Sequence, residues 1–99
     1  MAITIFWEDE GGKILANCPG SFSTNNYIAD IQNTCCLRFI DDLGDTTFNQ
    51  FQIPVLIKEL ESIIPKSKDA GTRDDVESLI AFIQKAVDQT HTYIKFYGD

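Results

Sequence analysis

Basic side chains are scarce in this sequence. Its 99 residues contain 8 Lys and Arg against 15 Asp and Glu, which gives a formal net charge of −7. A surface that binds duplex nucleic acid needs clustered Lys and Arg, so we expect no direct contact with nucleic acid. A negative field of this size attracts cationic molecules and speeds their arrival, although mild acidity also simply keeps a protein in solution.

Long hydrophobic runs are missing as well. Charged residues interrupt every apolar stretch well before the roughly 18 residues needed to span a membrane. Residues 1–8 have no basic start ahead of their apolar side chains and no small-residue cleavage site. We therefore expect no signal peptide, no membrane partner and a cytoplasmic location.

The three cysteines do not form a recognisable site. Cys18, Cys35 and Cys36 are odd in number, and two of them are adjacent, where a disulfide would be strained. The absence of a CxxC spacing argues against zinc-binding and thioredoxin-like sites. We expect three reduced thiols in a reducing compartment.

Motifs for catalysis, metals and cofactors are also absent. His91 is the only histidine, and no motif places a nucleophile beside it. If Asp41 opened a calcium loop, the required glycine would be Thr46 and the closing glutamate would be Gln52. We expect that the chain is not an enzyme and that it binds no metal and no cofactor. The alternative is a small enzyme in which His91 works with carboxylates from the turns.

The apolar residues that are present predict a folded domain. Hydrophobic residues make up 43% of the chain and aromatic residues 11%, which is typical of one globular domain spanning residues 1–99. In the first segment, Ile3, Ile5 and Trp7 alternate with Thr4 and Phe6, as in a strand. The strands predicted in this way are residues 2–7, 13–16, 35–40, 46–50 and 93–97, with the fourth returning as the hairpin partner of the third.

Helical periodicity appears in three segments. The first is residues 23–33, with Ser23 or Thr24 as its cap. Pro54 suits the first turn of a second helix, which Pro65 ends. Thr72 caps a third helix that ends near Gln89. Strands grouped ahead of two consecutive helices predict the α+β class, with two or three helices packed on one face of a mostly antiparallel sheet.

Carboxylates cluster directly after two of the predicted strands. The two clusters would lie at opposite ends of the sheet if those strands were antiparallel neighbours, and at the same end if they were parallel. Acids in turns are often merely solvated, and aromatic side chains in strands often belong to the core. Together they also suit a face that binds a cationic partner. The predicted partner-binding residues are Glu8, Asp9, Glu10, Asp41, Asp42, Asp45, Phe51 and Tyr97.

Two stretches resemble a group of small bacterial proteins of about this length. They are residues 37–52, which contain LRFID, GDT and FNQ, and residues 91–99, which contain HTYIKF and GD. The whole chain is also similar to the immunity proteins of contact-dependent growth inhibition systems. That resemblance implies a cytoplasmic inhibitor, monomeric or in a 1:1 complex, which covers the active site of a basic nuclease toxin, expected here to be a ribonuclease. The competing hypothesis is a small non-catalytic adaptor or regulatory protein with another partner.

Overall fold

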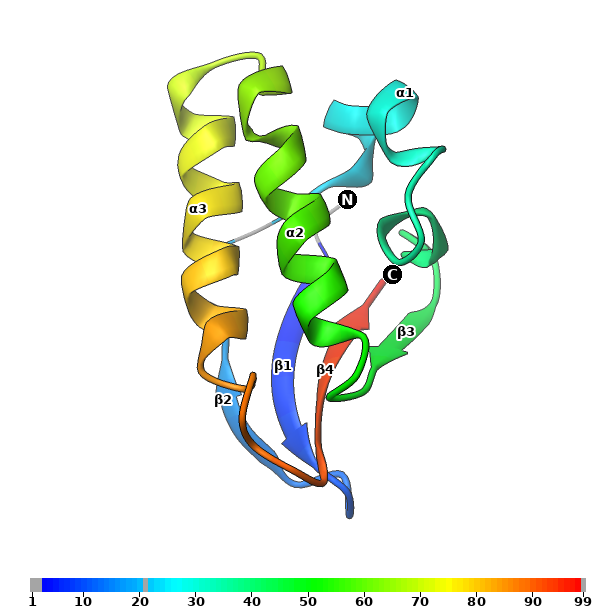
Figure 1. Cartoon of the computed structure of the whole chain (residues 1–99), viewed down its shortest axis with the longest axis vertical. Coiled ribbons are helices and arrows are strands. Elements are labelled where there is room, and N and C mark those ends of the chain that lie inside the picture. The colour runs from blue at the N-terminus through cyan, green and yellow to red at the C-terminus, as the bar shows by residue number, and fades with distance from the viewer. Residues whose placement is uncertain (1–2, 21, 99) are drawn as a thin grey trace.

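A four-stranded antiparallel sheet packs against a layer of helices in the computed structural model, which describes residues 3–20 and 22–98 (Figure 1). The sheet has the order β2-β1-β4-β3, so the C-terminal strand lies in its interior. The predicted α+β class is confirmed. The strands are β1 (Thr4–Asp9), β2 (Ile14–Asn17), β3 (Asp45–Phe48) and β4 (Thr92–Tyr97). The α-helices are α1 (Ile28–Ile31), α2 (Ile53–Ile63) and α3 (Ala70–Gln84).

Alternation along the central strands separates two faces of the sheet. Ile5 of β1 and Ile94 and Phe96 of β4 are buried on the face that α2 and α3 cover. The two strands pair from Thr4 opposite Tyr97 to Asp9 opposite Thr92. The inward positions are apolar because each fully buried Ile or Phe stabilises the fold by about 1.5–3 kcal/mol. The strand predicted at residues 2–7 is therefore present, although Ala2 lies outside the described residues.

The two long helices bury the stripes that their periodicity predicts. Both stripes join the cluster formed by the inward side chains of the sheet. The buried residues of the two helices are Ile53, Leu56, Ile57, Leu60, Ile63, Val76, Leu79, Ile80, Phe82 and Ile83. None of the described helices is both long and apolar enough to cross a membrane.

The strand predicted at residues 35–40 is wrong. The carboxylate of Glu59, on α2, accepts the backbone N–H groups of Cys35, Cys36 and Leu37 at 2.6, 2.9 and 3.0 Å. Backbone donors that converge on one side chain cannot also form a strand ladder, and Leu37–Phe39 is a 3₁₀ turn instead. The predicted hairpin is wrong for the same reason, since β3 pairs with β4.

Several predicted helix boundaries also differ. The cap of α3 is Asp69, whose carboxylate accepts the N–H of Thr72 at 2.7 Å, so Thr72 lies inside the helix that it was predicted to start. That helix ends at Gln84 and not near Gln89. After α2 the chain continues through Pro65 in a 3₁₀ turn, Ile64–Lys66, because proline fits the first turn of such a helix. The segment predicted as a helix at residues 23–33 is a 3₁₀ turn, Thr24–Tyr27, followed by the short α1.

Candidate protein-binding face

The face of the sheet that points away from α2 and α3, the outer face, carries an aromatic and charged surface. Residues directly opposite each other in an antiparallel pair share a face. On β1 and β4, Phe6 lies opposite Lys95 and Glu8 lies opposite Tyr93. On the other side of β4, Asp45 of β3 lies opposite Tyr97. Except for Glu8, all of these side chains keep part of their surface in solvent.

Glu8 is the buried polar group of this face. Only 5% of it is exposed, and its carboxylate accepts a short hydrogen bond from the hydroxyl of Tyr97. Tyr97 pairs with Thr4 in the register, so its side chain must lean along the sheet to reach Glu8. On the way its ring meets that of Phe6 edge to face, with 5.3 Å between the ring centroids. A buried carboxylate is costly without such a partner, so Tyr97 and Glu8 hold each other in place.

Lys95 completes this arrangement. Its ammonium nitrogen lies 4.8 Å from the centroid of the Tyr97 ring. The polar contact with Tyr97 raises the pKa of Lys95, and the nearby carboxylates of Glu8 and Asp45 add to the rise. The hydrogen bond to Glu8, together with burial, raises the pKa of the Tyr97 phenol. Both groups therefore keep their protons at neutral pH, and the centre of the outer face holds one carboxylate and one ammonium.

The two predicted acid clusters lie at opposite ends of this face. Asp45 is opposite Tyr97 at one end of β4, and Asp9 is opposite Thr92 at the other. Five strand steps separate the two ends, which is about 17 Å. The loop with Asp41 and Asp42 is tied to the Tyr97 end, because the N–H of Gly98 donates to the carbonyl oxygen of Gly44 at 2.7 Å. A Cβ atom on Gly98 would lie 2.5 Å from the carbonyl carbon of Asp42, so glycine is required there.

Three of the predicted acids also accept structural hydrogen bonds. The Asp9 carboxylate accepts the N–H groups of Gly11 and Lys13 in its own turn, each at 2.9 Å. Asp41 accepts the N–H of Leu43 in its own turn at 2.9 Å, and Asp42 accepts the hydroxyl of Thr24, 18 residues away, at 2.8 Å. These side chains are structural elements as well as charges. Glu10, Asp41 and Asp45 are exposed, and of these three only Asp41 accepts a backbone N–H within the described residues.

Phe51 and a shallow groove mark the Thr92 end of the face. The Phe51 side chain is 78% exposed and lies in the turn that leads into α2. The groove has a volume of about 270 Å³. Its lining residues are Asn49, Gln50, Phe51, His91, Thr92 and Tyr93. The structure thus places Phe51 beside the last strand, whose Tyr97 marks the other end of the same face.

The predicted partner-binding set lacks three residues of the outer face. Phe6, Tyr93 and Lys95 belong to this face, because the alternation in β1 and β4 places Phe6 opposite Lys95 and Glu8 opposite Tyr93. The alternation itself was visible in the sequence, but the pairing of the first strand with the last was not. Trp7, which alternates with Phe6 and Glu8 along β1, points the other way and packs against the core.

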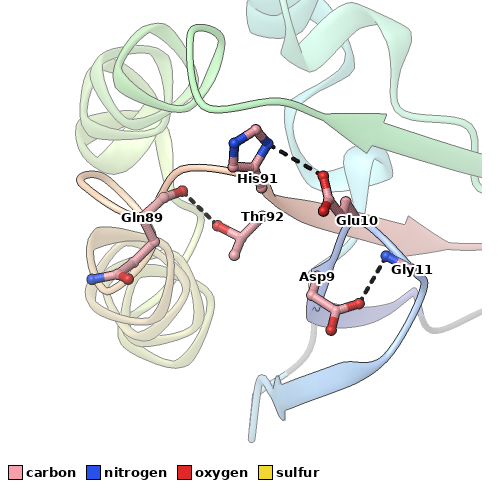
Figure 2. A network of polar contacts seen from close by, with 6 residues as sticks. All are labelled: Asp9, Glu10, Gly11, Gln89, His91 and Thr92. Carbon is pink, nitrogen blue, oxygen red and sulfur yellow. Dashed lines mark hydrogen bonds and ion pairs between the residues drawn. The ribbon is translucent and has the colours of Figure 1, made fainter.

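His91 and its neighbour Glu10, the pair that could carry out acid–base chemistry, lie in solvent. Nδ1 of His91 is 3.2 Å from the Glu10 carboxylate, and the two side chains are 75% and 67% exposed (Figure 2). Burial raises the pKa of the Cys18 and Cys36 thiols, which disfavours the nucleophilic thiolate. Within residues 3–20 and 22–98, no three His, Cys, Asp or Glu side chains are grouped to hold a metal ion.

Comparisons with known protein families, with curated proteins and with solved structures found no match to this chain. The chemistry of the outer face is therefore the basis on which a function can be inferred. That face combines aromatic rings in the centre with carboxylates at both ends.

Proposed function

We propose that this chain is an immunity protein. In this role it is a non-catalytic cytoplasmic protein that neutralises a cationic toxin domain by covering the toxin's active site in a 1:1 complex. The observation that carries the proposal is the outer face of the sheet. It presents Phe6, Tyr93 and Tyr97 around the buried Glu8, with acidic turns at both ends of β4.

The dimensions of this face suit a single partner. A standard interface buries about 800 Å² on each protein, which corresponds to a patch roughly 30 Å across. The two acid clusters are separated by about 17 Å along β4, so one partner can contact both of them. Tyrosine is enriched among the residues that dominate binding energy, because it adds a large rigid surface and one polar group.

The charge favours a basic partner. Carboxylates that flank an aromatic centre raise the rate at which a positively charged protein arrives, and the aromatic contacts slow its departure. A nuclease active site presents cations to bind phosphates, and carboxylates can replace the phosphates. The resemblance of the sequence to immunity proteins of contact-dependent growth inhibition narrows the proposed partner to a toxin nuclease, and to a ribonuclease in particular.

Co-expression with the toxin domain encoded by the gene immediately upstream tests the proposal. We expect cells that make both proteins to grow and cells that make the toxin alone to stop. We also expect the two proteins to co-purify at a ratio of one to one. Growth arrest despite stable expression of this chain, with no complex on purification, would remove the proposed function.

Paired charge variants test whether the acids of the outer face are responsible. Glu10→Gln with Asp45→Asn removes two exposed carboxylates that make no backbone hydrogen bond in the described structure. We expect association with the toxin at low salt to slow about tenfold, with a weaker salt dependence. Asp74→Asn with Glu77→Gln on α3 makes the same change of net charge in the helix layer and serves as the control. Equal slowing by both pairs would mean that net charge alone steers association.

A further inference from the structure

The groove at the Thr92 end of the outer face is aromatic and lacks its own cation. Phe51 and Tyr93 contribute the rings, and none of the lining residues is Lys or Arg. A second hollow of about 290 Å³ shares Gln50 and Phe51 with this groove and is also lined by Val87 and Asp88. Phe51 therefore borders two hollows.

The turn that carries Phe51 is ordered by reciprocal hydrogen bonds. The side-chain oxygen of Asn49 accepts the N–H groups of Phe51 and Gln52 at 2.9 and 3.1 Å. In return, the side-chain oxygen of Gln52 accepts the N–H of Asn49 at 2.9 Å. This is the pattern of a capping box at the start of a helix. The backbone that carries the exposed ring is thus ordered before any partner arrives, which reduces the entropy that this turn loses on binding.

A carboxylate lies beside His91, one of the residues that line the same groove. Figure 2 shows the His91 ring and the Glu10 carboxylate pointing toward each other, where the β1–β2 turn meets the start of β4. His91 has a φ of 60°, a conformation that few residues other than glycine adopt, so its backbone is tightly determined. An incoming cation that competes with His91 for Glu10 would find the carboxylate already in place.

The other strongly exposed phenylalanine shows which group suits such a ring. Phe39 is 60% exposed, and the guanidinium of Arg38 lies over it, 4.7 Å from the ring centroid. Within the described part of the chain, no Lys or Arg takes that position over Phe51. Phe39 is therefore covered by a guanidinium of this chain, whereas the Phe51 ring is open to a cation from a partner.

We propose that this groove binds an arginine side chain of the cationic partner. The guanidinium stacks on the Phe51 ring and pairs with the Glu10 carboxylate in place of His91. Arginine is favoured over lysine because its planar fork can stack and bind a carboxylate through two donors at once. This inference rests on the proposed function and names the group by which the toxin is recognised at this end of the face.

Two short peptides test the groove without the toxin. Acetyl-Gly-Arg-Gly-amide and acetyl-Gly-Lys-Gly-amide are titrated into the isotopically labelled protein, and amide chemical shifts are followed. With the arginine peptide we expect saturable shifts at residues 49–52 and 91–93, and with the lysine peptide an affinity about 2–5-fold lower. Phe51→Ala should lower the affinity for the arginine peptide by a similar factor, and Phe51→Tyr should preserve that affinity.

Phe39→Ala is the matched control, since it removes another strongly exposed phenylalanine ring, over which Arg38 already lies. Equal binding of the two peptides, unchanged binding by Phe51→Ala, or shifts confined to other regions would overturn the inference. If the groove does not bind the arginine peptide while co-expression still protects cells, the inference about the groove is wrong and the proposed function stands. If the groove binds arginine but co-expression gives neither protection nor a complex, the proposed function is wrong.

Discussion

At the scale of single residues, Glu8 and Tyr97 define the outer face. The sequence predicts Glu8 as one of three acids in an exposed turn, because it directly precedes Asp9, Glu10 and two glycines. In the structure it still belongs to β1 and is 5% exposed beneath Tyr97. The pattern of alternation places Glu8 on the outer face, but the tyrosine that covers it comes from a strand 89 residues later. Such a contact has no signal in a single sequence.

Removing the hydroxyl of Tyr97 should therefore destabilise the fold. Tyr97→Phe keeps the ring against Phe6 but leaves the Glu8 carboxylate buried without its donor. We expect a lower urea midpoint than in the wild type. Tyr93→Phe, on the same strand and the same face, should change the midpoint little. Adding Glu8→Gln to Tyr97→Phe should recover part of the lost stability, because the side chain that stays buried at position 8 without its donor is then uncharged.

The same pair predicts how stability depends on alkaline pH. The pKa of the Tyr97 phenol is raised in the folded protein by its hydrogen bond to Glu8, and that of Lys95 is raised by its contact with Tyr97. A raised pKa means that the folded state holds its proton more tightly than the unfolded state. This stabilisation is complete below the unfolded value of about 10 and is lost as pH rises above it. Between pH 8 and pH 11, the urea midpoint of Tyr97→Phe should therefore fall less than that of the wild type.

At the scale of elements, Glu59 decides the conformation of residues 35–40. Their composition is that of a strand, and nothing local contradicts it. A carboxylate from α2 binds three successive backbone N–H groups and turns the segment into a 3₁₀ helix. Prediction succeeded for α2, α3, β1 and β4, where periodicity and burial agree along the whole element. It failed where one long-range side chain outweighed local propensity.

Glu59→Gln should consequently cost more stability than an ordinary surface change. An amide offers one acceptor oxygen where the carboxylate offers two, so at least one of the three N–H groups loses its partner. We expect a loss of about 1–3 kcal/mol in the free energy of unfolding, measured by urea denaturation. Glu61→Gln, at an exposed position on the same helix, should change it by less than about 0.5 kcal/mol. Similar values for the two variants would contradict the role assigned to Glu59.

At the scale of the whole molecule, the strand order creates the candidate site. Because β4 lies between β1 and β3, the two acid clusters fall at its two ends, and the aromatic side chains of β1 and β4 lie between them. Composition and the order of elements were enough to predict the α+β class and an acidic surface. They could not predict the insertion of the last strand into the middle of the sheet, on which the shape of this surface depends.

Hydroxyl-radical footprinting of this chain, free and bound to the toxin domain encoded upstream, tests most sharply which face binds the toxin. We expect oxidation of Phe51, Tyr93 and Tyr97 to fall in the complex. Oxidation of Ile64 and Pro65, in the helix layer, should stay unchanged. Protection of the helix layer with continued oxidation of the three aromatic residues would contradict the claim that the outer face of the sheet is the docking surface.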